Sequence, residues 1–445
     1  MGLDLRQAPL RRGRVGRRGN MRTIIRLIVA IAVLAGIGGI FAWRSAIAPV
    51  ERPQASAFQG DAVKAGASLA AVGNCITCHT KDGGAAFAGG RPIETPFGKI
   101  HATNITPDPV TGIGRWSEAA FVRAVREGVA RDGRHLYPAF PYDHMAKTTD
   151  ADIKNVYAFL MTRTATAAPT PANNLGFPYN MRSLVAFWKL LYHDRSAFKP
   201  QAAQSAEWNR GAYLVEGLAH CGSCHTPRNA MGAEDSARPY AGAEVQGWTA
   251  PALGATSDAA VPWTAERLYD YLRKGRSPQH GVAAGPMAPV VRNLAGVSDA
   301  DIKAIATYVA SIAGAPSEVR QAQGARAIAR AKGEGGPTRS APPGPGAAIY
   351  AGACAQCHGE AGRAPLDPAL NLALSTSVRA GSPNNLVRVI LGGISQADNA
   401  PGPLMPGFAA VLDDKQTADL VAYVRANFTD RPALAGVDGA ARRAR

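Results

Sequence analysis

The chain contains the stretch Cys75-Ile76-Thr77-Cys78-His79, which has the form C-x-x-C-H. This form is the attachment signature of a c-type haem. Two thiols one helical turn apart can reach the two vinyl groups of one porphyrin, and the histidine that follows is then placed beneath the iron as the proximal ligand. A single C-x-x-C-H can also belong to a zinc site or a thiol-redox site, so the rest of the chain has to decide between these interpretations.

The same pattern occurs twice more, at Cys221-Gly222-Ser223-Cys224-His225 and at Cys354-Ala355-Gln356-Cys357-His358. The three copies use all six cysteines of the chain. A zinc ribbon needs cysteine pairs that lie close together in the sequence, and these pairs are far apart. The sequence therefore predicts three covalently bound haem c groups. The attaching residues would be Cys75 and Cys78, Cys221 and Cys224, and Cys354 and Cys357, and the proximal ligands would be His79, His225 and His358.

Three similar units follow one another along the chain, and each contains one haem motif. Each unit opens with a short helical stretch that carries a glycine, and these stretches start at Gly66, Gly211 and Gly346. Each unit closes with an amphipathic helix begun by a capping residue, and these helices start at Thr149, Ser298 and Asp414. Apolar residues recur at intervals of three and four in the closing helices, which gives each helix one stripe to bury. We expect the first and last helices of a unit to cross and to cover one haem.

The predicted fold is mostly α, with three tandem cytochrome c domains after one N-terminal transmembrane helix. The predicted domains are residues 58–165, 200–315 and 344–430, and residues 316–343 are predicted to be a flexible linker because their second half is rich in Gly and Pro. The apolar residues within 177–199 suit either an interdomain packing helix or a surface that faces a partner. Residues 431–445 are expected to form a frayed basic tail.

The N-terminus combines an arginine-rich segment, residues 1–22, with an apolar segment, residues 23–44. The apolar segment is either a transmembrane anchor or a cleaved signal peptide. Ala46-Ile47-Ala48 offers a small-x-small cleavage site, but proline would follow the cut. The length of the apolar segment and the Trp43-Arg44 boundary favour an uncleaved spanning helix. In both cases the arginines hold the N-terminus in the cytoplasm and place the remaining chain in the periplasm, at the inner membrane.

Each unit also offers a methionine before its closing helix, at Met145, Met287 and Met405. A loop fixed by proline can hold a thioether sulfur against the iron, and His/Met ligation raises the reduction potential. Core packing is the commoner use of a single methionine, but three at equivalent places indicate axial ligands. His144 and His280 are rival ligands in the first two units, whereas no histidine follows His358 in the third.

The composition argues against several other functions. The net charge is +16, but residues 1–44 contribute half of it through nine arginines and one aspartate, and no basic motif with interleaved aromatic residues supports nucleic-acid binding. The sequence contains no phosphate loop, dinucleotide fingerprint or nucleophile elbow. If all three irons are six-coordinate, no iron is open to substrate, and the chain is predicted to carry electrons without being an enzyme by itself.

Four further stretches resemble one family. They are the stretch from Thr103-Asn104-Ile105-Thr106-Pro107-Asp108 through Trp116-Ser117, the stretch His135-Leu136-Tyr137-Pro138-Ala139-Phe140-Pro141-Tyr142, the residues Cys224-His225-Thr226-Pro227-Arg228-Asn229, and Pro383-Asn384-Asn385-Leu386. Together they are similar to the trihaem cytochrome c subunits of bacterial membrane-bound dehydrogenases of the alcohol, aldehyde, gluconate or nicotinate dehydrogenase type. His101 stands where that family more often has tyrosine.

The resemblance implies a function and partners. The chain would pass electrons from a catalytic dehydrogenase subunit, which is a quinoprotein, flavoprotein or molybdoprotein, to ubiquinone or a terminal oxidase of the respiratory chain. It also implies that Met145, Met287 and Met405 are axial ligands. Two alternatives stay open: a free-standing or oxidase-associated multihaem cytochrome c, and a haem peroxidase, which needs an iron with a free or displaceable position.

Overall fold

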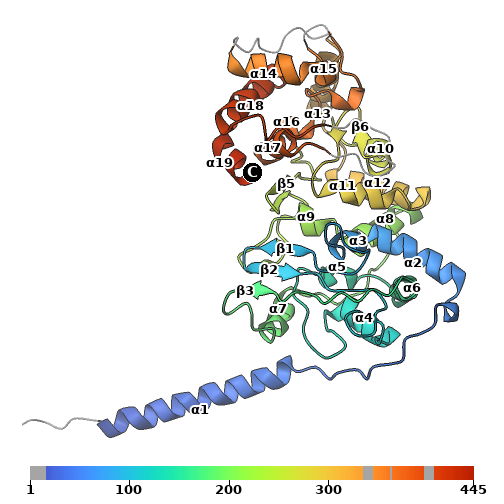
Figure 1. Cartoon of the computed structure of the whole chain (residues 1–445), viewed down its shortest axis with the longest axis vertical. Coiled ribbons are helices and arrows are strands. Elements are labelled where there is room, and N and C mark those ends of the chain that lie inside the picture. The colour runs from blue at the N-terminus through green and yellow to red at the C-terminus, as the bar shows by residue number, and fades with distance from the viewer. Residues whose placement is uncertain (1–16, 334–343, 361–362, 395–404) are drawn as a thin grey trace, which may run out of the picture.

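The computed structural model describes residues 17–333, 344–360, 363–394 and 405–445. These residues are mostly helical, and the strands among them are short (Figure 1). Helix α1 (Arg17–Ala42) extends away from the body of the molecule. By length and composition, its segment Met21–Ala42 is able to cross a membrane. Residues 1–16 of the predicted arginine-rich segment lie outside the described residues.

Three helical regions, each with one haem motif, follow α1 in chain order. The first region contains η1 (Ala55–Ala57), α2 (Gly60–Val72), α3 (Cys75–Cys78), β1 (Pro92–Thr95), β2 (Gly98–His101), α4 (Glu118–Glu127), α5 (Tyr142–Met145) and α6 (Asp150–Met161). The connection to the second region contains β3 (Asn174–Leu175) and α7 (Leu184–Tyr192). The three strands form an antiparallel sheet in the order β1-β2-β3.

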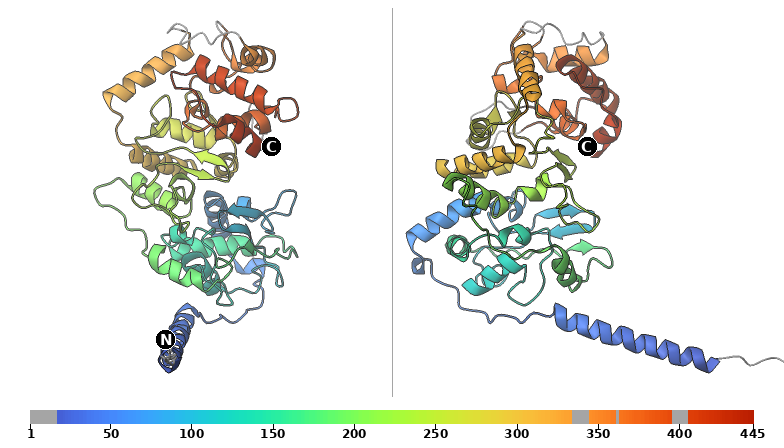
Figure 2. Two further views of the ribbon diagram at one scale, coloured as in Figure 1. Left: turned by 90° about the vertical axis from the view of Figure 1, so that its left-hand side faces the viewer. Right: turned by 180° about the vertical axis from the view of Figure 1, so that it is seen from behind.

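The second and third regions have the same general plan. The second contains α8 (Ala206–Glu216), α9 (Gly222–His225), β4 (Ala243–Val245), β5 (Trp248–Ala250), α10 (Ala265–Lys274), β6 (Arg276–Ser277), β7 (Gly281–Val282), α11 (Met287–Leu294) and α12 (Asp299–Ala313). After α13 (Glu318–Ala331), the third contains α14 (Pro345–Ala353), α15 (Ala355–His358), η2 (Pro368–Leu370), α16 (Thr376–Arg379), α17 (Asn384–Gly392) and α18 (Asp414–Phe428), and α19 (Val437–Ala444) follows it. Figures 1 and 2 show the second region between the first and the third.

The opening and closing helices of each region pack against one another, as expected from the sequence: α2 on α6, α8 on α12, and α14 on α18. A glycine on each opening helix lets that helix approach its closing helix closely. A side-chain Cβ added at Gly66, Gly211 or Gly346 would lie only 2.9, 2.8 or 3.0 Å from the Cβ of an aromatic residue on the closing helix. The closing helices begin at caps. Thr149 and Ser298 accept hydrogen bonds from backbone N–H groups as predicted, whereas Asp413, one residue before the predicted start, caps α18.

The hydrophobic core is divided unequally. One continuous cluster of buried residues runs through the first and second regions, from Leu69 to Val309. The third region has its own cluster around Tyr350, which is fully buried. The first two regions therefore form one packed body, and the third packs as a separate core.

Helix α13 occupies part of the segment that was predicted to be a flexible linker over residues 316–343. The structure differs from that prediction because Ser317 caps the helix and Ala327 is buried with Val261 and Leu374. Residues 334–343, the Gly- and Pro-rich part, lie outside the described residues.

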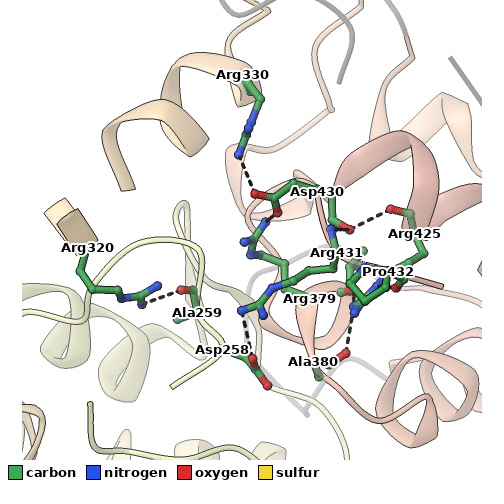
Figure 3. Close-up of polar contacts among 12 residues, drawn as sticks. Asp258, Ala259, Arg320, Arg330, Arg379, Ala380, Arg425, Asp430, Arg431 and Pro432 are labelled. Atoms are coloured by element: carbon green, nitrogen blue, oxygen red, sulfur yellow. Dashed lines mark hydrogen bonds and ion pairs between the residues drawn. The ribbon is translucent and has the colours of Figure 1, made fainter. Parts of the chain in front are cut away.

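A cluster of arginines and aspartates joins α13 to the second and third regions (Figure 3). The carboxylate of Asp430 lies 3.1 Å from Arg379 and 3.8 Å from Arg330 on α13. Arg431 forms an ion pair with Asp258 of the second region at 3.1 Å. These contacts hold the linker helix and the third region against the second.

The C-terminus also differs from the prediction of a frayed tail. Residues 437–444 form α19, which packs against α17 and α18 and buries Ala440 and Ala441 in the core of the third region. Arg445 forms an ion pair with Asp414 at 2.9 Å. Buried alanines in the helix and an ion pair at its C-terminal end therefore order a segment whose composition is basic.

Candidate haem-binding sites

The first haem motif lies at the break between α2 and α3. Asn74 has a left-handed backbone conformation, with φ of 51°, and precedes α3 directly after Gly73, which ends α2. Its side chain accepts a hydrogen bond of 2.6 Å from Thr77 inside the motif. Cys75 and Cys78 then occupy the first and last positions of α3, three residues apart, so both thiols lie on one face of a single helical turn. This is the arrangement that two thioether bonds to one porphyrin require.

The three histidines that were predicted to be proximal ligands share one kind of contact. The Nδ1–H group of His79 donates to the carbonyl oxygen of Thr103 at 2.6 Å, that of His225 to Pro251 at 2.7 Å, and that of His358 to Leu370 at 2.8 Å. A hydrogen bond at Nδ1 fixes the tautomer and leaves the lone pair of Nε2 free for a metal. Burial lowers the pKa of all three imidazoles, against the opposing effect of the carbonyl contact, so the rings are neutral near pH 7. The residues present therefore fit haem iron at all three motifs.

The first two motifs face one continuous cavity of about 1990 Å³. Ligand pockets in proteins usually have volumes of about 300–1,000 Å³, so this cavity has room for two large groups. Its lining includes every predicted attachment and axial residue of the first two motifs: Cys75, Cys78, His79, Met145, Cys221, Cys224, His225 and Met287. In the third motif, Cys354 and Met405 both pack against the separate core of the third region.

The predicted methionine ligands occupy similar places. Met145 ends the short helix α5 after Pro141 and is 5% exposed. Met287 begins α11 directly after Pro286. Met405 is held by two backbone hydrogen bonds to Ile394, at 2.9 and 3.2 Å. Each methionine backbone is thus fixed by a proline or by pairing, as an axial ligand requires.

The two rival histidines differ from one another. Both ring nitrogens of His144 are engaged: Nδ1 donates to the carbonyl of Glu216 at 2.9 Å, and Nε2 donates to the carboxylate of Glu234 at 2.7 Å. Burial lowers the pKa of His144, but Glu234 raises it by more, so the net shift is upward and a charged pair results. His144 therefore has no nitrogen to offer to iron.

His280 lines the cavity and stacks on Trp263, with ring centroids 3.4 Å apart. Its side chain is buried, and neither ring nitrogen has a hydrogen-bond partner among the described residues. Burial lowers the pKa of His280 to about 3, which keeps the ring neutral. His280 thus remains a rival of Met287 in the second region.

Buried polar contacts between the first two regions were not apparent in the sequence. Glu216 accepts hydrogen bonds from Tyr240 at 2.6 Å and from Tyr308 at 2.7 Å, and it pairs with Lys147 of the first region at 3.1 Å. Burial raises the pKa of Glu216, but Lys147 and the two tyrosines lower it by more. These residues lie on two helices and in two loops and form no motif, so the sequence carries no signal that would have found them.

Family models match three parts of the chain. Residues 63–164 match the model described as cytochrome c. Residues 206–309 and 341–424 match the model described as cytochrome c oxidase, cbb3-type, subunit III. Each matched segment contains one of the three motifs described above.

Curated relatives cover most of the chain. It is 45% identical over 413 residues to a nicotinate dehydrogenase subunit of Pseudomonas putida, a match that covers 91% of this chain but only 34% of that protein. The fructose dehydrogenase cytochrome subunit of Gluconobacter japonicus is 34% identical, with 88% of this chain and 84% of that protein covered. The gluconate 2-dehydrogenase cytochrome c subunit of Pantoea cypripedii is 38% identical, with 82% and 85% covered. The chain therefore belongs to the family of cytochrome c subunits of membrane-bound dehydrogenases.

Proposed function

We propose that the chain is a trihaem electron-transfer subunit of a membrane-bound dehydrogenase. It would consist of three tandem cytochrome c domains, near the predicted bounds 58–165, 200–315 and 344–430. One observation carries the proposal: each of the three C-x-x-C-H motifs has a histidine whose Nδ1 is bonded to a backbone carbonyl, which leaves Nε2 for iron. Haem bound there would supply one-electron chemistry, and the protein would set the potential through ligand, burial and hydrogen bonds.

The haem count tests this directly. The purified chain should carry three covalent haems, measured by intact mass and by a pyridine haemochrome assay. Replacing both cysteines of one motif by alanine should lower the count by one, and the variants should behave alike for Cys75/Cys78, Cys221/Cys224 and Cys354/Cys357. A wild-type count of two would refute the trihaem proposal.

The axial ligands are tested one at a time. We expect Met145→Ala, Met287→Ala and Met405→Ala each to abolish His/Met ligation at one iron and to lower its potential. His280→Ala separates the two candidates in the second region. If Met287 is the ligand, the wild-type chain shows the methionine–iron charge-transfer band of that haem, and His280→Ala keeps it. If the wild type lacks this band for the second haem and His280→Ala turns that haem high-spin, the ligand is His280.

The arrangement of the regions supports a route in which the second region is central. It shares a cavity and a core with the first region. It reaches the third through Asn385 on α17, whose side chain accepts from the backbone N–H of Thr249 at 2.8 Å and donates to its carbonyl at 2.7 Å. Thr249 lies two residues before Pro251, whose carbonyl holds the proximal His225. These contacts would hold neighbouring sites close to one another, as electron hopping requires.

The partner and acceptor are proposed from the relatives. We expect a catalytic subunit that is a quinoprotein, flavoprotein or molybdoprotein, with ubiquinone or a terminal oxidase as acceptor. Purification of the native complex in mild detergent, with identification of every co-purifying chain, tests this. A large dehydrogenase subunit supports the proposal, and recovery of the haem protein alone refutes it.

The match to an oxidase subunit model favours one second candidate, an oxidase-associated carrier. Co-purification with oxidase subunits in place of a dehydrogenase would establish it. A haem peroxidase would instead show a high-spin ferric spectrum from an iron with a free position.

The proposed location is the periplasmic side of the inner membrane, with α1 as an uncleaved anchor. The span Met21–Ala42 is followed by Trp43 and Arg44, which suit a membrane–water boundary. N-terminal sequencing of the mature chain tests the anchor, because a start after Ala48 would show that α1 is a cleaved signal peptide.

A further inference from the structure

Exposed apolar side chains are concentrated beside α1. Outside α1 and Trp43, the large hydrophobic residues that are exposed in the described chain number twelve, and seven of them lie between residues 177 and 191. We call these seven the α7 patch: Phe177, Tyr179, Met181, Leu184, Phe187, Leu190 and Leu191. Leu190 and Leu191 are 66% and 71% exposed. A soluble surface rarely gathers so many large apolar groups in one short segment, so the patch needs a covering partner.

The patch is continuous with the proposed membrane span. The rings of Phe41 and Phe187 lie 5.5 Å apart, and Phe187 also lies directly beside Gly38. Both contacts are within Met21–Ala42, and Gly38 is four residues before its end. At about 1.5 Å per residue this places Phe187 roughly 6 Å inside the end of the span. Interfacial helices bury their apolar face to about 5–10 Å, so the depth of α7 is that of an interfacial helix.

The inner face of α7 and the end of α1 are fixed to the first region by one chain of hydrogen bonds. The carbonyl of Ala42 accepts from Nε2 of His135 at 2.8 Å, and Nδ1 of the same ring accepts from Nζ of Lys189 at 3.1 Å. Lys189 also donates to the carbonyls of Glu127 and Gly128, both at 2.6 Å. The end of the span, α7 and the first region therefore move as one unit. Figure 1 shows α1 leaving the molecule at the end where α7 lies.

The charge of the segment fits a lipid surface. Residues 177–192 contain Arg182 and Lys189 and no acidic residue. Lys189 is buried, and the half-buried Arg182 donates to the carbonyl of His135 at 3.0 Å, so the exposed face of the α7 patch is apolar and carries no acidic group. Exposed aromatic and aliphatic residues are typical of the apolar face of a helix that lies in the boundary between headgroups and acyl chains.

We propose that the α7 patch docks into the outer surface of the same bilayer that α1 spans, with a phospholipid surface as its partner. This inference rests on the proposed anchor. α1 and the patch would then make two contacts with the membrane, which fixes the orientation of the body. Helix α7 also supplies Leu184, Val185 and Trp188 to the wall of the cavity that holds the first haem motif. Docking would therefore keep that motif on the membrane side of the molecule.

The test is photolabelling of the full-length, haem-loaded chain in phosphatidylethanolamine–phosphatidylglycerol vesicles. A phospholipid with a diazirine at a shallow acyl position is activated by light, and the lipid adducts are mapped by mass spectrometry. We expect adducts on the peptides that cover residues 177–192. The matched control is the peptide that contains Leu366, a leucine that is 70% exposed and lies in the third region. It should show background labelling only.

The result also separates the two proposals. One possible result is that α1 carries adducts while residues 177–192 are labelled no more than the Leu366 peptide. That result would overturn the docking inference but would still support the membrane anchor. Absence of adducts on α1 would refute the anchor itself. In the double variant Leu190→Asp/Leu191→Asp, labelling of the patch should fall to that background while labelling of α1 persists. Because both side chains point outward, haem content should be unchanged, and unchanged labelling of the patch would count against docking.

Discussion

Two glycines of helix α14 make a matched pair for testing how the helices of a region are held together. A Cβ added at Gly346 would lie 2.7 Å from the carbonyl carbon of Asp419 and 3.0 Å from the Cβ of Tyr423, both on α18. A Cβ added at Gly352, six positions further along the same helix, would meet no atom within 4 Å. Gly346→Ala should therefore destabilise the third region, and Gly352→Ala should not.

The magnitude follows from the contacts. The atom nearest to the added Cβ is the carbonyl oxygen of Asp419. Atoms in good packing lie about 3.5–4.0 Å apart, so Gly346→Ala would force α14 and α18 apart by roughly 1 Å or more. Overpacking of this kind costs about 1–3 kcal/mol. At Gly352 the same change gains helix propensity, at most about 1 kcal/mol, and less near the helix end. The two substitutions should thus change the stability of the third region in opposite directions.

Hydrogen–deuterium exchange of the full-length, haem-loaded chain is the suitable assay, because a chain with two separate cores does not unfold in one step. A loss of about 2 kcal/mol corresponds to roughly thirtyfold faster exchange through local opening. We expect this change in the peptides of α14 and α18 in Gly346→Ala, with α2 and α6 unaffected. Equal exchange in Gly346→Ala and Gly352→Ala would refute the reasoning.

Three further changes test the contacts between elements. Burial raises the pKa of Asp430, but Arg379 lowers it by more. The ion pair should therefore stabilise the third region above the unfolded pKa of about 3.9 and be lost as the pH falls through the lower folded value. Asp430→Asn should cost about 0.2–1 kcal/mol at pH 7, measured as faster hydrogen–deuterium exchange in α16 and α18, and should exchange like the unchanged chain below the folded pKa. Lys189→Met leaves buried carbonyls without a donor and should cost about 1–3 kcal/mol, measured as faster exchange in α7, whereas unchanged exchange would show that these bonds do not hold the helix. Asn385→Ala removes both hydrogen bonds to Thr249 and should slow electron transfer between the second and third haems in pulse radiolysis, with the transfer between the first and second as the internal control.

Local signals predicted much of the candidate site. The C-x-x-C-H spacing depends on one helical turn, and α3 supplies that turn at Cys75. The caps at Thr149 and Ser298 were found because a side-chain oxygen bonds a backbone N–H only three residues away. The glycines of the opening helices were also recognised, although only the structure shows that they mark the crossings. Structural features that depend on residues a few positions apart can be predicted from the sequence in this way.

Structural features that depend on residues far apart in the sequence could not be predicted. Helix α13 lies in a segment expected to be a tether, because the apolar groups that hold it are Val261 and Leu374, far away in the sequence. Helix α19 was missed for a similar reason: its basic composition suggested a tail, while Ala441 fits a core built by α17 and α18. Small side chains carry little hydrophobic signal of their own, and their value depends on the shape of the surface that they meet.

The three sequence repeats also suggested three equivalent units, and the structure makes them unequal. The first and second regions bury one common core and face one cavity, whereas the third keeps its own core. The third is joined to the second by polar contacts, such as Arg276 with Asp367 at 3.0 Å and Arg431 with Asp258 at 3.1 Å, and by the small apolar cluster of Val261, Ala327 and Leu374. Polar interfaces tolerate relative motion more readily than a shared core. Within the proposed function, the separation between the first two sites is therefore the more rigid one, and the contact between the second and third regions is where electron transfer is most sensitive to mutation.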